Sequence, residues 1–367
     1  MRSPLCDAFG IDHPIFAFTP SEHVAAAVSR AGGLGVLGCV RFNDTDELER
    51  TLGWLDDNTD GKPYGVDVVM PMKVPTEGTS VDLQAMIPPE HLSFVERTLQ
   101  QLGVPPLPEG EGRAGVLGWL HSVARSHVDV ALAHRPVLIA NALGSPPLDV
   151  IEKAHEHGVK VAALAGAAKH ALSHVANGVD VIVAQGYEAG GHTGEIASMV
   201  LTPEIVDAVG PDVPVLGAGG IGSGRQIAAS MALGAQGVWT GSIWLGTEEY
   251  QNLQSNEGWT EAFTRATSSD TVRTRIYTGK PARLLKTRWT EAWAADDAPE
   301  PLPMPLQNLL VAEAHNRINA SGDPDVISMP IGQIVGRMNE VRPVAEVMAD
   351  LVSGFADAVA RLDKLRA

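Results

Sequence analysis

Eight short apolar runs alternate with amphipathic segments along most of this 367-residue chain. Each run is continuously apolar, as is typical of a strand buried on both faces of a parallel sheet. The runs are Ile15–Phe18, Gly35–Leu37, Gly65–Met70, Val137–Ala140, Lys160–Leu164, Val179–Ala184, Val213–Ala218 and Gly237–Thr240. Alternating strands and helices indicate βαβ units, and eight such units predict an α/β fold closed into a TIM-type (β/α)8 barrel. An open doubly wound sheet is the alternative.

The segments between the runs supply the helices that such a barrel requires. Helical periodicity predicts helices at Glu22–Ala31, Thr45–Asp57, Gly115–Ala133, Leu148–His157, Ala167–Ala176 and Gly224–Leu233. Beyond the eighth run, further helices are expected at Glu257–Thr267, Leu309–Asn319 and Val341–Leu365. The last of these is expected to pack on the barrel exterior.

These patterns divide the chain into two parts. Residues 1–246 contain the predicted barrel, and residues 247–367 form a helical extension that is expected to pack on the barrel and close its site. Within the barrel part, residues 71–112 are rich in Pro, Gly and Glu and interrupt the third unit. A long insertion after a barrel strand lies on the face that carries active sites, so this one is either a lid or a tolerated surface loop.

Composition and charge narrow the class of protein. A net charge of −17 argues against nucleic acid and anionic membranes as partners, because the long-range field of the protein repels polyanions. Cys6 and Cys39 have no metal or redox spacing, which fits a reducing compartment. No secretory signal is visible, and no apolar run reaches the ~18–20 residues of a membrane-spanning helix. A cytoplasmic protein is expected, and a homodimer is left open.

A glycine cluster, residues 217–222, follows the seventh run. It has the G-x-G-x-x-G spacing of dinucleotide sites, but it does not follow the first strand, and the next strand ends without an acidic residue. Barrels commonly bind phosphate between the loops after strands seven and eight, where Gly219, Gly220, Gly241 and Ser242 lie in this chain. The pattern therefore predicts a site for a phosphate-bearing cofactor, although tight turns alone would also use such glycines.

His192 lies in a glycine-rich segment, Gln185–Gly194, just beyond the sixth run. Barrel geometry puts this segment on the active-site face, and the flanking glycines leave room for a cofactor and a substrate. Because a neutral imidazole accepts or donates a proton near pH 7, His192 is the catalytic candidate. A hydrogen-bonded structural histidine is the alternative. Glu188 is expected either to orient His192 or to pair with a helix terminus.

Other candidate sites have less support. His170 and His174 lie four residues apart on a predicted helix, but neither a third ligand nor an H-E-x-x-H pattern accompanies them. No metal site is therefore predicted, and no nucleophile elbow is present. The basic stretch from Arg265 to Arg288 is expected to be a solvated face, or else a rim that attracts an anionic substrate or carrier.

Taken together, these segments resemble the nitronate monooxygenase (2-nitropropane dioxygenase) family of FMN-dependent barrels. The matching stretches are Ala25–Gly38, Gln185–Gly194, Val215–Gly224 and Gly237–Leu245, with weaker agreement at Thr278–Arg283 and Gly332–Gly336. The resemblance covers most of the chain, residues 71–112 excepted.

The resemblance implies that FMN lies across the barrel mouth, with His192 facing its reactive side. The cofactor contacts it implies are Ala17, Phe18, Thr19, Asp67, Gln185, Gly190, Gly191, Ala218, Gly219, Gly220, Thr240, Gly241, Ser242 and Gln333. Two positions depart from the family pattern: Phe16–Thr19 replaces a Q-A-P-M-like stretch, and Asp67 replaces an asparagine. A carboxylate at Asp67 would alter the electrostatics beside the flavin.

For function, the resemblance implies a monooxygenase that converts alkyl nitronates and O2 to carbonyl compounds and nitrite. His192 would bind the nitro group or deprotonate a neutral nitroalkane. The runner-up is a flavin-dependent dehydrogenase or reductase of the same superfamily, acting on an acyl-CoA or acyl-carrier-protein thioester with NAD(P)H. A third reading, a flavin-binding barrel with a sensory or scaffolding role, would require His192 to be dispensable.

Overall fold

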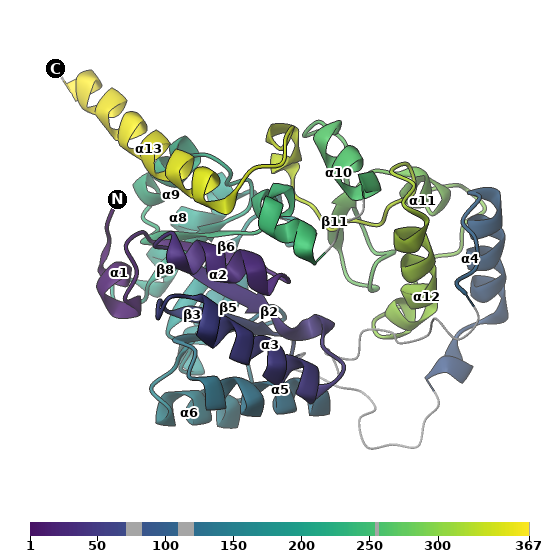
Figure 1. Cartoon of the computed structure of the whole chain (residues 1–367), viewed down its shortest axis with the longest axis horizontal. Coiled ribbons are helices and arrows are strands. Elements are labelled where there is room, and N and C mark those ends of the chain that lie inside the picture. Colours follow the sequence, from purple (N-terminus) through teal and green to yellow (C-terminus); the bar gives the residue numbers. More distant parts are fainter. Residues whose placement is uncertain (71–82, 109–120, 254–256, 367) are drawn as a thin grey trace.

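The eight apolar runs form the strands of a closed parallel barrel (Figure 1). The computed structural model describes residues 1–70, 83–108, 121–253 and 257–366. In barrel order the strands are β1 (Ile15–Thr19), β2 (Leu34–Gly38), β3 (Tyr64–Val68), β4 (Leu138–Asn141), β5 (Lys160–Ala165), β6 (Val181–Gln185), β8 (Val215–Ala218) and β9 (Gly237–Thr240). Pairing of β1 with β9 closes the ring. The predicted barrel is confirmed, and the open sheet is excluded.

Side chains fill the barrel interior, and a short helix packs with them. Every second residue of a strand faces the barrel interior. These inward-facing residues form one buried cluster with Phe9 of α1 (Pro4–Phe9), and they include Phe16, Val36 and Leu216. The rings of Phe9 and Phe16 meet edge to face, with centroids 5.2 Å apart. Helix α1 was absent from the expected helices, because six residues are too few to show a clear helical period.

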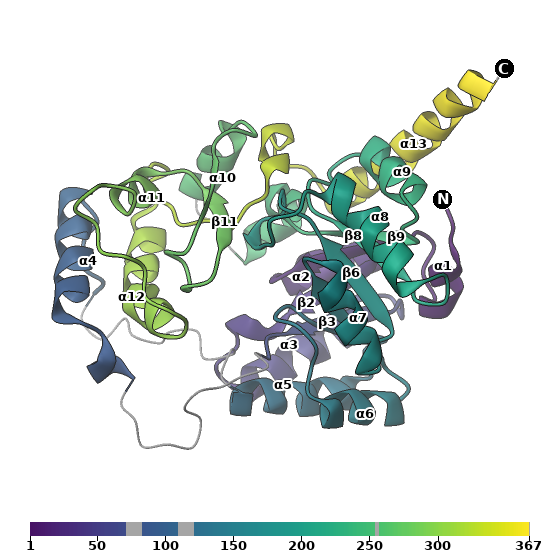
Figure 2. The same cartoon turned by 180° about the vertical axis from the view of Figure 1, so that it is seen from behind.

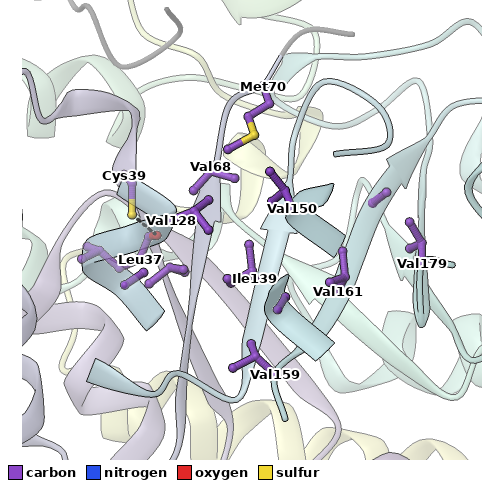
Figure 3. Packing of buried hydrophobic residues seen from close by; sticks show 14 of the residues in the cluster. Leu37, Cys39, Val68, Met70, Val128, Ile139, Val150, Val159, Val161 and Val179 are labelled. Atoms are coloured by element: carbon purple, nitrogen blue, oxygen red, sulfur yellow. Dashed lines mark hydrogen bonds between the residues drawn. The ribbon is translucent and has the colours of Figure 1, made fainter. Parts of the chain in front are cut away.

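Helices surround the barrel and bury the outward faces of its strands. They are α2 (Glu22–Arg30), α3 (Thr45–Asn58), α5 (His121–His134), α6 (Leu148–Glu156), α7 (Ala168–Ala176), α8 (Ser198–Val209) and α9 (Gly224–Ala232). Figure 3 shows part of this outer core, where Leu37 and Val68 of adjacent strands lie close to Val128 of α5. The alternation of inner and outer clusters along each strand fixes which side chains can face the barrel mouth.

Helix α8 corrects the expected series, in which no helix separated the sixth and seventh strands. It contains Pro203, whose ring removes a backbone donor from the helix. Leu201, Thr202 and Ile205 are nevertheless buried, so packing against the barrel outweighs the cost of the proline.

The inserted segment joins the extension. Residues 71–82 and 109–112 of it lie outside the described part of the chain. Between them, α4 (Pro89–Gln101) packs against α12 (Leu306–Ser321). The buried guanidinium of Arg317 donates to the carbonyl oxygens of Val104 and Pro105 and pairs with Glu96 at 2.7 Å. Figure 2 shows α4 and α12 side by side, away from the barrel. The helix predicted at 115–133 corresponds to α5. Its first six predicted residues, 115–120, lie outside the described part of the chain.

The rest of the extension lies over the mouth and along one side of the barrel. It comprises α10 (Glu257–Thr264), β10 (Thr271–Thr274), β11 (Ala282–Leu285), α11 (Arg288–Ala292), α12, the 3-10 helix η5 (Gln333–Arg337) and α13 (Val344–Asp363). Strands β10 and β11 form a small antiparallel sheet with β7 (Gly191–His192), which leaves the barrel after β6. Helix α13 packs against α9 and α2, as expected for the last predicted helix. Within the described residues, every helix is too short or too polar to span a bilayer.

We predict that Phe9→Ala lowers the free energy of unfolding by about 3–5 kcal/mol, because it removes a buried ring and leaves a cavity against Phe16. Urea titration followed by tryptophan fluorescence measures the change. Leu148→Ala is the control, since that side chain is 58% exposed. Equal stability of the Phe9 variant and the control would show that α1 does not contribute to the core.

Candidate functional site

The carboxyl ends of the strands meet at one mouth, whose floor is the last inward-facing layer of the barrel. Phe18 of β1 and Gln185 of β6 are partly exposed there, and the Phe18 ring stacks on Trp239 with centroids 6.3 Å apart. The Gln185 side chain has no hydrogen bond within the described residues. A partly exposed apolar ring and an uncommitted amide at the same mouth suit a flat ligand with a polar edge.

Asp67 of β3 belongs to the same layer and is 2% exposed. Its Oδ2 is fully covered and lacks a hydrogen-bond partner in the described part of the chain. Burial raises the pKa of this carboxyl well above its usual value.

Three other residues that were predicted to contact the cofactor have side chains that point away from the mouth, so only their backbone could contact a ligand. Ala17 and Thr19 alternate with Phe18 and are buried on the outer side of β1, where Thr19 Oγ1 accepts a hydrogen bond from Ser21 N–H at 3.1 Å. Thr240 Oγ1 donates to Phe16 O and accepts from Trp244 Nε1 at 3.0 Å. The Thr240 side chain therefore joins strands and helix together, a role that the sequence did not indicate.

The loop after β8 has the geometry of an anion site. Gly219 and Gly220 have φ of +97° and +69°, a conformation that successive non-glycine residues rarely adopt. Gln226 stabilises the loop: its Oε1 accepts from Gly222 N–H and Ser223 Oγ at 3.0 and 2.9 Å, and its Nε2 donates to Gly220 O. The S-x-x-Q spacing of Ser223 and Gln226 is the sequence signature of a helix N-terminus. It could have identified Gln226, which the sequence analysis missed.

Gly241 and Ser242 follow β9, next in the barrel. A methyl group added to Gly241 would touch only the Phe18 ring, at 3.9 Å, so space lies in front of this backbone. Ser242 Oγ accepts a hydrogen bond from Gly332 N–H at 2.8 Å, which leaves its own proton free to be donated. These two loops thus present backbone amides and a hydroxyl donor on neighbouring strands.

A cavity of about 540 Å³ adjoins the glycine pair and extends between α8 and α9. Four predicted residues line it: Ala218, Gly219, Gly220 and Gln333. Gly241 and Ser242 do not line it, although Gly332 connects Ser242 to the same wall. Arg337, at the end of η5, also lines the cavity and adds a cation that the sequence analysis did not single out.

His192 stands on β7, beside the mouth. Register pairs it with Ala282 of β11, and its Nε2 lies 2.7 Å from Thr278 Oγ1. Burial and the nearby charge of Lys280 lower the pKa of His192 to about 4. The imidazole is therefore neutral at pH 7 and able to hydrogen-bond a ligand.

The loop that carries His192 is fixed by residues outside the barrel. Arg283 of β11 is 2% exposed and donates to Tyr187 O through Nε and Nη2, at 3.2 and 2.9 Å. Its guanidinium lies 4.4 Å from the centre of the Tyr187 ring. Glu188 accepts hydrogen bonds from Ser198 N–H and Oγ at the start of α8. Of the two roles expected for Glu188, the structure supports pairing with a helix terminus.

The C-terminal segment meets this loop backbone to backbone. Gln333 N–H donates to Glu188 O at 3.0 Å. A side chain on Gly190 would collide with Gly332 N at 2.6 Å, so the glycine is required by close approach. Gly191 has a φ of +71°, and a Cβ added to it would meet nothing within 4 Å, so the space beside His192 is open.

The basic stretch proves to be divided between structural and exposed roles. Arg273 and Arg283 bond to the His192 loop, and Arg265 and Lys286 form exposed ion pairs with Asp325 and Glu291. Lys280 is exposed, and its ammonium has no partner among the described residues. Only part of the stretch is therefore the solvated face that the sequence predicted.

The paired histidines of α7 separate in the structure. The His174 ring nitrogens lie 2.7 Å from Ser145 Oγ and 3.1 Å from Leu164 O, so both are engaged. Across the described ranges, no three His, Cys, Asp or Glu side chains form a cluster suited to a metal ion.

Comparison with known proteins gives consistent matches. A family model described as nitronate monooxygenase matches residues 2–354. A "putative monooxygenase" of Mycobacterium tuberculosis is 49% identical, over 100% of this chain and 99% of that protein. A "probable nitronate monooxygenase" of Staphylococcus aureus strain JH9 is 27% identical, over 96% of this chain and 97% of that protein.

Two solved structures are similar over nearly their whole length. Nitroalkane oxidase from Streptomyces ansochromogenes has a TM-score of 0.78 at 25% identity, covering 98% of this chain and 99% of that one. FabK from Thermotoga maritima has a TM-score of 0.75 at 25% identity, covering 100% and 99%.

We predict that His192 makes the protein less stable as the pH falls from its unfolded pKa of 6.5 toward its folded pKa of about 4. In that window the unfolded chain binds a proton that the folded protein does not, so the unfolded state gains free energy. Thermal midpoints of the wild type should fall below those of His192→Gln, with a gap that widens as the pH decreases. His157→Gln, at an exposed histidine, is the control. Parallel curves for wild type and His192→Gln would contradict the buried, neutral imidazole.

Proposed function

The chain belongs to the nitronate monooxygenase family, a family of flavin-dependent oxidoreductases, and we propose that it binds FMN and oxidises alkyl nitronates with O2. The observation that carries the proposal is a neutral histidine held beside a barrel mouth that has the features of a flavin site. Nitroalkane oxidase, one of the similar structures, supports nitro compounds as the substrate class.

The residues of the mouth fit a flavin mononucleotide. Gly219 and Gly220, with their positive φ, turn the loop after β8 so that its amides are available to a phosphate. Gly241 and Ser242 would complete the phosphate site. Gly241 leaves open space in front of its backbone, and Ser242 has a hydroxyl proton free to be donated. Phe18 and Gln185 would contact the ring system, the first by packing and the second by a hydrogen bond to its polar edge.

The flavin, when bound, supplies the electron acceptor that reacts in turn with O2. In the overall reaction one nitronate anion takes up one oxygen atom derived from O2. That atom becomes the oxygen of the carbonyl product, and the nitro group leaves as nitrite. The protein must therefore bind an anion, orient its reactive carbon and keep it out of water.

His192 suits the nitronate better than the neutral nitroalkane. A base with a pKa of about 4 has little driving force to remove a proton from carbon at pH 7. The same imidazole, still neutral, can donate a hydrogen bond to a nitro oxygen while Thr278 holds its Nε2. Lys280, exposed and close enough to depress the pKa of His192, adds a positive charge that attracts the anion.

The structure gives less support to the alternative function, a reductase of acyl thioesters that uses NAD(P)H. It depended on a basic rim, yet Arg283 is buried and Arg273 bonds to the Thr193 carbonyl at 3.3 Å. Arg283 is therefore closed off from a phosphate-rich carrier, and Arg273, 21% exposed, is engaged with the His192 loop and with Glu195. That residues 71–112 act as a lid over the mouth, and that the chain divides at residue 246, remain predictions.

The direct test is an anaerobic titration of purified protein, followed in the visible spectrum. Ethylnitronate alone should bleach the FMN absorbance of the wild type, whereas NAD(P)H alone should not. His192→Ala should retain FMN but react at least about a hundredfold more slowly, because it loses the group that orients the anion. Bleaching by NAD(P)H alone would favour the reductase, and unchanged reaction of His192→Ala would remove the role proposed for that residue.

A second test addresses the phosphate site. Gly241→Asp should weaken FMN binding by at least about tenfold, because its carboxylate would oppose the phosphate. Gly241→Asn adds a side chain of nearly the same size without charge, and it is the matched control. Riboflavin, which lacks the phosphate, should bind the two variants alike. If Asp and Asn change FMN affinity equally, the phosphate lies elsewhere.

A further inference from the structure

Asp67 is a buried carboxyl that has no hydrogen-bond partner among the described residues. Val66 and Val68 face the outer core, so Asp67 faces the barrel interior. By register its neighbours there are Gly38 of β2 and Ala140 of β4, which have no polar side-chain group to offer. The described residues give the carboxyl no hydrogen bond, and Oδ2 is completely covered. Such a group costs free energy unless something else satisfies it.

The charges around Asp67 do not compensate a carboxylate. Cys39, which begins the 3-10 helix after β2, is the titratable group that interacts with Asp67, and burial raises the pKa of its thiol so that it stays neutral. Arg41, on the same helix, pairs with Glu22 at 2.7 Å and with Glu47 at 3.5 Å. From β4, the side chain of Asn141 bonds to the backbone of Met70 and does not titrate. With only the described groups around it, a negative charge at Asp67 would therefore be buried without a counter-ion, which is strongly unfavourable.

The protonated form resolves this problem and matches a flavin. A carboxylate only accepts hydrogen bonds, whereas a carboxylic acid has one O–H donor and one carbonyl acceptor. The polar edge of a flavin ring likewise alternates carbonyl oxygens with an N–H group. Because Oδ2 is covered, the oxygen that can reach a ligand is Oδ1. Resting on the FMN site proposed above, we propose that Asp67 is protonated on the floor of the mouth and donates an O–H on Oδ1 to a carbonyl oxygen of the flavin ring.

The protonated acid has two consequences. The floor under the ring carries no negative charge, so it does not oppose the arrival of electrons on the cofactor. FMN affinity also becomes dependent on pH, because deprotonation removes the donor and leaves a carboxylate facing a carbonyl oxygen. Burial sets the direction: the pKa of Asp67 is raised, so the donor persists to a higher pH than in an ordinary aspartic acid and is lost as the pH increases further.

The test compares FMN dissociation constants of wild type, Asp67→Asn and Asp67→Leu from about pH 6 to about pH 9, by quenching of flavin fluorescence. Asparagine keeps a donor and an acceptor at nearly the same size, and leucine removes both. Wild type and Asp67→Asn should bind alike at low pH. At higher pH the wild type should weaken relative to Asp67→Asn, approaching about tenfold per pH unit beyond the folded pKa. Asp67→Leu should bind weakly throughout.

Two measurements on apoprotein check the protonation itself. An infrared difference spectrum between wild type and Asp67→Asn should contain the carbonyl stretch of a protonated acid at neutral pH. Because the folded state holds a proton that the unfolded state releases near pH 4, the stability of the wild type relative to Asp67→Asn should fall as the pH rises from about 4 toward the folded pKa of Asp67.

The outcomes separate this inference from the cofactor assignment. If none of the three proteins binds FMN, the proposed function fails. If all bind FMN, but wild type and Asp67→Asn share one pH profile and no acid band is found, only the role of Asp67 is overturned. Binding of FMN to Asp67→Leu as tightly as to Asp67→Asn would also overturn it, because the hydrogen bond would then contribute nothing.

Discussion

The buried guanidinium of Arg283 is the contact on which the arrangement of the site depends. It joins β11 of the extension to the carbonyl oxygen of Tyr187, in the loop after β6, and also donates to Thr271 of β10 at 3.0 Å. Removing a guanidinium from water is costly, and here both carbonyl and hydroxyl acceptors offset the loss. His192 follows this anchor on the same loop, so the barrel alone does not fix the side chain proposed to be catalytic. The extension completes the site.

That dependence explains why the sequence predicted the scaffold better than the site. Strand boundaries follow from local apolar runs, and Gly237–Thr240 is the same in prediction and structure. The loops proposed to bind phosphate follow from glycines next to those strands. The partners of the functional side chains are distant, however: Thr278 is 86 residues from His192, and Arg283 is 96 residues from Tyr187. No periodicity within a window of ~11–18 residues can detect such pairs.

The features that the sequence did not predict were missed for specific physical reasons. Helix α8 was missed because Pro203 breaks the helical pattern, although burial of one face stabilises the helix. Helix α4 lay within a segment read only as an insertion, and its partner α12 comes about two hundred residues later. Asp67 was recognised as a departure from the family pattern. Its protonation depends on the absence of partners in three dimensions, which composition cannot reveal.

The electrostatics of the mouth differ from those of the protein as a whole. A protein of net charge −17 repels anions at long range, yet the proposed cofactor and substrate are both anions. The local structure removes negative charge where they would lie: Glu188 is turned toward α8, and Asp67 is buried with a raised pKa. Donors take its place, namely loop amides, the Ser242 hydroxyl and the Lys280 ammonium. At hydrogen-bond distance from the proposed ligands, these groups would outweigh a distant field that salt screens over a Debye length of about 8 Å. The proposed anion site is thus a property of the mouth, independent of the charge of the whole protein.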